Sequence, residues 1–168
     1  MNCFFHVDRN GGLQEGQEIN FVKFYEIKPD ELQDHFNVLY PEGFSNWGIN
    51  FMLNYANNTD SLTEILFDYV RRSCFKERPS RFQSVFAFDN IEQAKDFRYR
   101  FNNSIGNIWE IEANNFFKAD MNLLDLKSFK LMQVDYHAHL YWKGETIGNP
   151  YWEYLLVPPV KVIRKVDG

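Results

Sequence analysis

Three short segments of this chain combine polar side chains with apolar, strand-like runs, and together they could form one dispersed active site. They are residues 5–9 (Phe-His-Val-Asp-Arg), residues 80–88 (Ser-Arg-Phe-Gln-Ser-Val-Phe-Ala-Phe) and residues 151–156 (Tyr-Trp-Glu-Tyr-Leu-Leu). In chain order they supply an imidazole, then a guanidinium and a hydroxyl among aromatic rings, then a carboxylate. Such groups can exchange hydrogen bonds, bind phosphate, stack on flat ligands and stabilise positive charge.

The first segment places a histidine inside a predicted strand. His6 is flanked by Phe4, Phe5 and Val7, and a lone histidine in such a run is more often a satisfied core residue than a ligand contact. A neutral imidazole can nevertheless both donate and accept a hydrogen bond. Arg9, at the mouth of the same strand, is either an exposed arginine or a phosphate contact.

The second segment alternates between two kinds of side chain. In a strand, Ser84, Phe86 and Phe88 share one face, while Val85 and Ala87 share the other. A hydroxyl beside two aromatic rings suits a flat ligand. The alternative is a core strand in which Ser84 is a chance polar position.

The third segment carries Glu153 at the start of an apolar strand. Burying a carboxylate costs free energy unless it is paired or hydrogen-bonded. Glu153 is therefore either exposed at a sheet edge or buried for a functional reason, and it is the strongest single candidate for a catalytic residue.

The order His6, then Arg81/Ser84 with aromatic residues, then Glu153 resembles the three-motif signature of the ADP-ribosyltransferase superfamily, enzymes that cleave NAD at its nicotinamide bond. Residues 79–88 resemble the second motif of a branch found in short prokaryotic and phage-related proteins. Ser84 lies 78 residues after His6, and Glu153 lies 69 residues after Ser84, so the resemblance covers most of the chain.

The resemblance implies a role for each of these residues. His6 would bond a ribose hydroxyl of NAD, Ser84 would orient the nicotinamide, and Glu153 would stabilise the oxocarbenium-like transition state. The implied catalytic residues are Glu153, His6 and Ser84, and the implied NAD contacts are His6, Val7, Arg9, Arg81, Ser84, Phe86 and Phe88. Where members with a His-Tyr-Glu triad have a tyrosine, this chain has Phe86 or Phe88, which lack a hydroxyl.

The order of predicted elements indicates an α+β fold, because strands occur throughout without a βαβ rhythm. We expect strands at residues 3–7, 19–27, 83–88, 105–111, 153–157 and 160–166. We expect helices from 29 to about 40, 46–55, about 60–72, from 90 past 101, and about 128–142. The resemblance implies a single domain over residues 1–168, with two small, roughly perpendicular sheets that clamp NAD and with helices inserted between the first and second motifs.

Composition limits the classes of partner. The 168 residues are 45% hydrophobic and 18% aromatic, and the net charge of −5 argues against a nonspecific nucleic-acid binder. Residues 71–81 nevertheless carry five basic side chains and one acidic one, and Lys161, Arg164 and Lys165 form a second basic cluster. Each cluster is either a solvated face or a phosphate contact.

Other classes of site have no support in the sequence. Two cysteines make neither a disulfide framework nor a zinc site, the four histidines lack metal-type spacing, and no Rossmann or P-loop glycine pattern is present. We therefore expect no metal. The absence of an 18-residue apolar stretch and of a signal sequence predicts a cytoplasmic protein without a membrane contact.

The favoured function is an NAD-dependent ADP-ribosyltransferase that uses NAD as substrate and acts as a toxin or phage-defence effector, with a possible cognate antitoxin. Its acceptor would be a macromolecule, with nucleic acid, possibly RNA, slightly favoured over protein because of the basic run at 71–81. One alternative is an NAD glycohydrolase on the same fold, in which water replaces the acceptor. Another is a non-catalytic module that binds a nucleotide or a partner, which the missing tyrosine supports.

Overall fold

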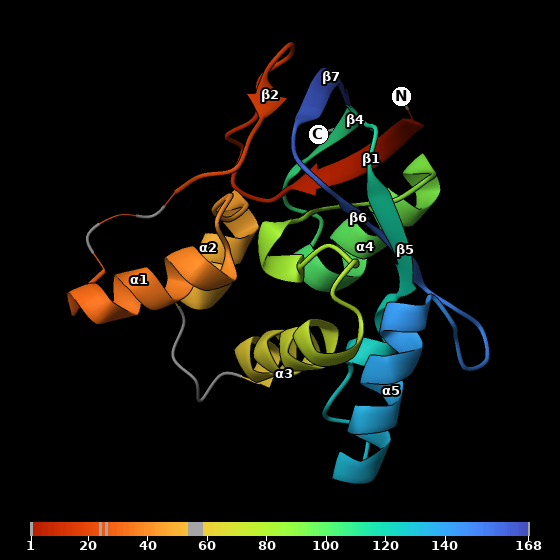
Figure 1. Cartoon of the computed structure of the whole chain (residues 1–168). Helices are drawn as coiled ribbons and strands as arrows, with labels where there is room; N and C mark the ends of the chain where they lie inside the picture. The colour runs from red at the N-terminus through yellow and green to blue at the C-terminus, as the bar shows by residue number, and fades with distance from the viewer. Residues whose placement is uncertain (1, 24, 26, 54–58, 168) are drawn as a thin grey trace.

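The computed structural model describes residues 2–23, 25, 27–53 and 59–167. Within these residues the chain forms a mixed α+β fold with two antiparallel sheets and five α-helices (Figure 1). The predicted fold class is therefore confirmed at this level. None of the described helices is long and apolar enough to span a bilayer.

The larger sheet has the strand order β1-β4-β7-β2. Its strands are β1 (Asn2–Asp8), β4 (Asn107–Ala113), β7 (Val160–Asp167) and β2 (Glu18–Ile19). The smaller sheet has the order β3-β6-β5, with strands β3 (Val85–Ala87), β6 (Trp152–Leu156) and β5 (Phe116–Asp120). The two sheets meet at a backbone bridge between Phe5 and Phe88, which brings the first and second segments together.

Three helices lie between the first and second segments, as predicted: α1 (Asp30–Leu39), α2 (Asn46–Met52) and α3 (Thr59–Cys74). The others are α4 (Ile91–Asn102) and α5 (Leu131–Lys143), with short 3-10 turns η1 (Arg81–Gln83) and η2 (Met121–Leu124). Two predicted helix ends are confirmed. The Asn90 side chain accepts from the Gln93 N–H to cap α4, and Gly144 ends α5 with a φ of 75°.

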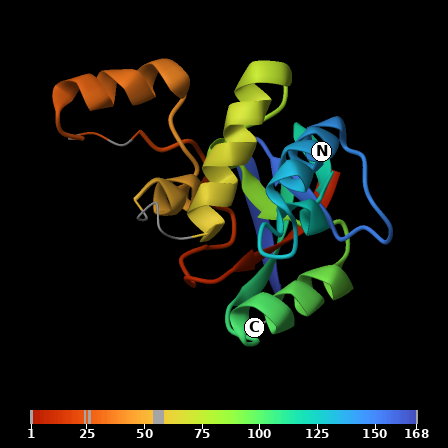
Figure 2. The ribbon, with the colours of Figure 1, turned by 90° about the horizontal axis from the view of Figure 1, so that it is seen from below.

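The elements stack in layers (Figures 1 and 2). Helices α3 and α5 pack on the outer face of the smaller sheet, and α4 packs on the outer face of the larger sheet. Between the sheets lies a core that includes Phe4, Ile111, Val85, Ala87 and Leu156. This core explains the alternation in the second segment, because Val85 and Ala87 face it while Phe86 and Phe88 face away.

Some predicted strands differ from the structure. The strand expected over residues 19–27 pairs with β7 only at Glu18–Ile19, after which Val22 bridges Phe44 instead; Phe24 and Glu26 lie outside the described residues. The strand expected at 83–88 begins at Val85, because residues 81–83 form η1. Strand β5 was not predicted at all, and the end of the helix expected at 46–55 lies outside the described residues.

The contact between α2 and η1 depends on a glycine. A Cβ atom added to Gly48 would lie 1.8 Å from the Phe82 carbonyl oxygen. We expect Gly48→Ala to destabilise the protein by about 1–3 kcal/mol despite alanine's better helix propensity, because the backbone must shift. Urea unfolding measures this change. Gly12→Ala, which meets nothing within 4 Å, is the control, and an equal effect of both substitutions would contradict the packing argument.

Candidate active site

The centre of the candidate site is the guanidinium of Arg81, which is only 5% exposed. It binds Glu64 of α3 with two parallel hydrogen bonds, Nε to Oε2 at 2.7 Å and Nη2 to Oε1 at 2.9 Å. Its Nη1 donates to Oε1 of Glu153 at 2.5 Å. Arg81 therefore links the second segment to the third, and both to a helix of the inserted part.

Tyr141 of α5 completes this cluster. Its hydroxyl donates to Oε1 of Glu153 at 2.8 Å and also accepts from Arg81. The Phe86 ring lies under the guanidinium, with 4.5 Å between the Arg81 carbon Cζ and the ring centroid. Glu153, at 3% exposed, is therefore buried with one carboxylate oxygen held by two donors, which excludes the alternative of an exposed sheet edge.

The charges of this cluster do not balance by themselves, since two carboxylates share one guanidinium. Burial raises the pKa of Glu64, although the attraction of Arg81 works in the opposite direction. Burial is also the largest cause that raises the pKa of Tyr141 well above its ordinary value, so its hydroxyl stays protonated and remains a donor.

A second cluster lies beside the first on α3. The carboxylate of Asp68 accepts from Tyr40 at 2.6 Å, from Ser80 at 2.8 Å and from Arg71 Nε at 2.9 Å, and it forms an ion pair with Arg72 at 2.9 Å. Taken together, the two clusters hold three carboxylates and three guanidinium groups. This balance is one physical reason that so many charges can be buried.

His6 provides a different kind of group. It is 2% exposed, and its Nδ1 lies 2.7 Å from the Phe86 carbonyl oxygen. A carbonyl only accepts, so Nδ1 carries the proton and Nε2 is left as an acceptor. Nε2 is buried without a protein partner among the described residues. Burial lowers the pKa of His6, which favours the neutral ring.

The structure thus joins all three segments. The first meets the second through the His6–Phe86 bond and the Phe5–Phe88 bridge. The second meets the third through Arg81 and Glu153 and through the pairing of β3 with β6. His6 and Glu153 themselves are not in contact.

Four other predicted site residues lie elsewhere or have local roles. Val7 and Phe88 are buried in the cluster under α4, and the Arg9 guanidinium lies 4.9 Å from the ring centroid of Phe97 in that helix. The Ser84 hydroxyl donates to the Ser80 carbonyl at 2.8 Å. The side chains of Val7 and Phe88 therefore pack in the core, and the hydroxyl proton of Ser84 is used within its own turn.

The basic run at residues 71–81 is not a free positive surface. Arg71 and Arg81 are buried, and with Arg72 they pair with Asp68, Glu64 and Glu153. The sequence count missed these partners because they are distant along the chain or lie on the preceding turns of α3. Arg71, Arg72 and Arg81 therefore do not indicate a phosphate-rich partner, because each is already paired with a carboxylate. In the second cluster, Arg164 pairs with Glu110 at 2.7 Å.

Several functional candidates were missed because the buried face of α3 is predicted only in part by its apolar residues. The i, i+3, i+4, i+7, i+8 spacing of Leu62, Ile65, Leu66, Tyr69 and Val70 predicts a buried apolar face; Ile65, Leu66 and Val70 are partly buried against the core, but Leu62 and Tyr69 are exposed. The buried face carries Thr63, Glu64, Phe67, Asp68 and Arg71. The i, i+4 spacing of Glu64 and Asp68 places both carboxylates on one face of the helix and could have indicated a polar buried face. No sequence pattern pointed to Tyr141 or to Trp47, whose ring centroid lies 4.6 Å from that of His6.

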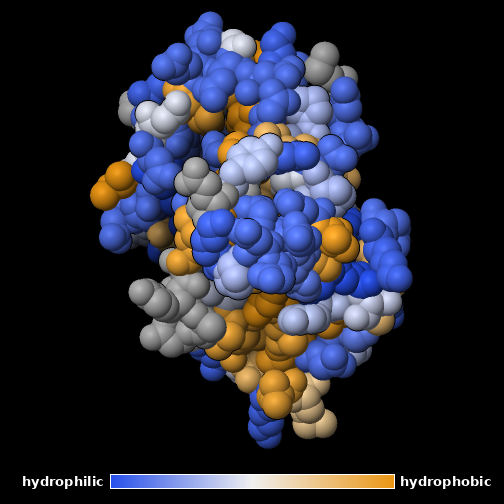
Figure 3. Space-filling model, turned by 60° about the vertical axis from the view of Figure 1, so that its left-hand side comes forward, coloured by the Kyte–Doolittle hydropathy of each residue, from blue (hydrophilic) through white to orange (hydrophobic). Residues whose placement is uncertain are grey.

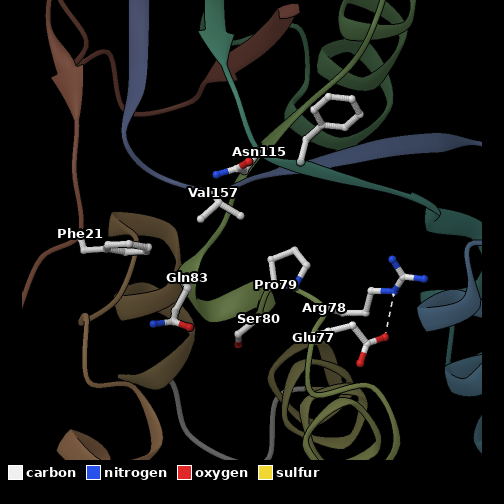
Figure 4. A pocket seen from close by; sticks show the side chains of 9 residues that line it. Phe21, Glu77, Arg78, Pro79, Ser80, Gln83, Asn115 and Val157 are labelled. Carbon is white, nitrogen blue, oxygen red and sulfur yellow. Dashed lines mark ion pairs between the residues drawn. The ribbon is translucent and has the colours of Figure 1, made fainter. Parts of the chain in front are cut away.

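The described residues form cavities that open on the surface. One of about 400 Å³ is lined by residues that include Ser80 and Gln83 of the second segment (Figure 4). Another, of about 330 Å³, is apolar and lies between α1 and α2, lined by residues such as Phe36, Ile49 and Met52. Neither is lined by His6 or Glu153.

Comparison with known families places the chain in one of them. Residues 4–168 match the family described as "Protein of unknown function (DUF2441)", and the chain belongs to that family. No curated protein matches the sequence.

The Arg81 cluster predicts a large effect of removing the guanidinium. We expect Arg81→Met to reduce the free energy of unfolding by about 3–5 kcal/mol, because it leaves two buried carboxylates without their cation. Urea denaturation measures the loss. The control is Arg100→Met, which breaks an exposed i, i+4 pair with Asp96 and should cost less than about 1 kcal/mol. Equal losses would contradict a central role for Arg81.

The buried imidazole predicts a pH dependence. The folded protein resists protonation of His6 while the unfolded chain takes up the proton near pH 6.5, so stability should fall as the pH drops below that value. The contribution is at most one proton, or about 1.4 kcal/mol per pH unit. Unfolding measured between pH 7.5 and 5 should show a smaller slope in His6→Asn. His35→Asn, at an exposed histidine, should keep the wild-type slope, and an unchanged slope in His6→Asn would refute the assignment.

Proposed function

We propose that this protein is an NAD-dependent ADP-ribosyltransferase built on an ADP-ribosyltransferase-like fold, with two roughly perpendicular sheets. The observation that carries the proposal is the meeting of the three resembling segments through the His6–Phe86 and Arg81–Glu153 contacts. These residues are far apart in the sequence, and the resemblance requires them to be neighbours in space.

The state of His6 supports the proposal. Its unpartnered Nε2 is an acceptor in a buried setting, and a buried acceptor without a donor costs free energy. A ribose hydroxyl is a donor of suitable size. The imidazole would thus hold the nicotinamide-side ribose without any proton transfer.

Tyr141 supplies a tyrosine hydroxyl beside Glu153, which the second segment of the sequence does not. The resembled triad contains a tyrosine that the second segment lacks. A buried tyrosine hydroxyl nevertheless lies 2.8 Å from Glu153, supplied by α5. We propose that Tyr141 takes over the positioning of Glu153, while Phe86 offers an aromatic face beside it.

In the proposed reaction the bond between the ribose C1′ and the nicotinamide nitrogen breaks. The electron pair leaves with nicotinamide, which becomes neutral, and positive charge spreads over C1′ and the ring oxygen. The Glu153 carboxylate stabilises this charge and accepts from the 2′-hydroxyl. The acceptor then attacks C1′, forms the new glycosidic bond and releases its proton to water. Because this charge exists only near the transition state, Glu153 should affect turnover more than binding.

The burial of Glu153 sets a requirement on this reaction. At 3% exposure, the carboxylate reaches a ribose only when neighbouring side chains move. Arg81 is the natural candidate, because its Nη1 holds Oε1 of the carboxylate. We propose that the Arg81–Glu153 pair is the resting state of the site.

The acceptor in this proposal is a macromolecule. It is either a nucleic acid, such as RNA, or a protein. Because the buried arginines of residues 71–81 are already paired with carboxylates, they do not favour a nucleic-acid acceptor over a protein. The proposal also includes action in the cytoplasm as a toxin or phage-defence effector and a neutralising partner protein. The hydrophobic side chains that gather on the lower part of the face in Figure 3 offer such a partner a surface.

A second candidate is a binding module without catalysis. The observation that favours it is the occupied Glu153 carboxylate, which in this reading serves only to pair Arg81 and Tyr141. An NAD glycohydrolase would use the same residues with water as acceptor, and no contact distinguishes it from the transferase.

The test is NAD consumption by the purified protein and by Glu153→Gln. We expect a loss in kcat of about 100-fold or more with NAD affinity changed only a few-fold, because mainly transition-state stabilisation is removed. Glu145→Gln, at an exposed site, is the matched control. Tyr141→Phe, which removes only a hydroxyl, should also lower kcat.

Folding must be separated from catalysis, since Glu153 also pairs with Arg81. Each variant is therefore compared by its unfolding midpoint and by its NAD affinity. A folded Glu153→Gln protein that consumes NAD at the wild-type rate would refute the catalytic assignment. A folded wild-type protein that consumes no NAD with a lysate as acceptor source would favour the binding module.

A further inference from the structure

The cavity of about 400 Å³ lies where four separate parts of the chain meet. Phe21 comes from the segment after β2, Pro79 and Gln83 from the second segment, Asn115 from the turn before β5, and Val157 from the end of β6. Figure 4 shows Phe21 reaching in from one side, with Val157 and Asn115 above it and Gln83 below. The volume falls within the range of about 300–1,000 Å³ that is typical of small-ligand sites.

Two aromatic rings line this cavity. Phe116 is 42% exposed, and its ring packs against Phe4 and Tyr154, with 5.1 Å and 5.8 Å between ring centroids. Phe21 is half-buried and has no aromatic partner among the described residues. Open aromatic faces in a concave site are suited to stacking on a planar ring.

Two amide side chains add hydrogen-bonding groups without a complete set of protein partners. Gln83 donates from Nε2 to the Gly43 carbonyl at 2.8 Å, which fixes the amide so that Oε1 remains as an acceptor. Asn115 accepts from the Val157 N–H through its backbone oxygen at 2.9 Å. Its side chain is solvent-exposed, and its amide, which has no hydrogen bond to any described residue, offers both a donor and an acceptor at the cavity.

The rim carries one cation held in place. The Arg78 guanidinium donates to the Trp142 carbonyl at 3.1 Å and lies 4.6 Å from the Phe117 ring centroid. Its ion pair with Glu77 is long, at 3.6 Å, and both side chains are solvent-exposed in part. The N–H groups of this guanidinium other than Nε remain available to donate to a phosphate at the mouth of the cavity.

We propose that this cavity is a nucleobase-binding site. A base would stack against Phe21 and Phe116, while Gln83 Oε1 and the Asn115 amide would bond the donors and acceptors on its edge. This is how proteins read unstacked bases. The same chemistry fits a base from NAD or a base from a separate nucleotide acceptor.

This inference goes beyond the proposed function, because base binding here does not require Glu153. The two sites are nevertheless connected through the second segment. Ser80 and Gln83 line the cavity on either side of Arg81, whose side chain holds Glu153.

The test is a titration of the isotope-labelled full chain with AMP, followed by the side-chain amide signals of Asn115 and Gln83. We expect both to shift, and we expect Asn115→Ala to weaken AMP binding by about fivefold or more, the value of one hydrogen bond. Asn114→Ala, at an exposed neighbour outside the cavity lining, should leave the affinity unchanged. Ribose 5-phosphate, which lacks a base, should not shift the two amide signals.

AMP that leaves these two signals in place at millimolar concentration would overturn the inference, as would equal effects of Asn114→Ala and Asn115→Ala. Competition with NAD and with a short single-stranded oligoadenylate identifies which molecule supplies the base. Because the AMP titration needs no NAD turnover, failure of the cavity assignment and failure of the transferase proposal give different results.

Discussion

The arrangement of the site depends on the hydrogen bonds of one buried group, the guanidinium of Arg81. It joins η1 to α3 through Glu64, and to the smaller sheet through Glu153. Tyr141 adds α5 to the same point. The helical layer and the smaller sheet therefore meet at a polar junction as well as at the apolar contacts of Phe67, Leu155 and their neighbours.

A buried cluster of charged side chains adds little to the free energy of unfolding by itself. Buried ion pairs roughly balance the cost of removing their charges from water, and well-packed apolar residues often do as well or better. The face of α3 that holds Glu64, Asp68 and Arg71 is thus more polar than folding needs. Conflicts between local pattern and fold are expected at functional sites. Among the described residues, the charged face of α3 and the unpartnered Nε2 of His6 are two such conflicts.

The sequence predicted the parts of the fold that depend on local chemistry. The strand around His6, the cap at Asn90 and the stop at Gly144 follow from apolar runs and from backbone preferences within a few residues. The orientation of α3 could not be predicted in the same way, because its charged face is stabilised by Arg81, more than a dozen residues away. Strand β5 was missed since it has few β-branched residues and is defined by its pairing with β6. The cost of burying a carboxylate indicates that Glu153 has a partner, but nothing in the sequence indicates that Tyr141 is one of them.

We propose that the three distant segments form one site for NAD. The most direct measurement is a crystal structure of the full chain with NAD bound, using Glu153→Gln to prevent cleavage. We expect the nicotinamide-side ribose to lie within hydrogen-bond distance of both His6 Nε2 and the side chain at position 153, with Arg81 displaced from that side chain. NAD that binds elsewhere, with Arg81 still against residue 153 and His6 Nε2 still unpartnered, would contradict it.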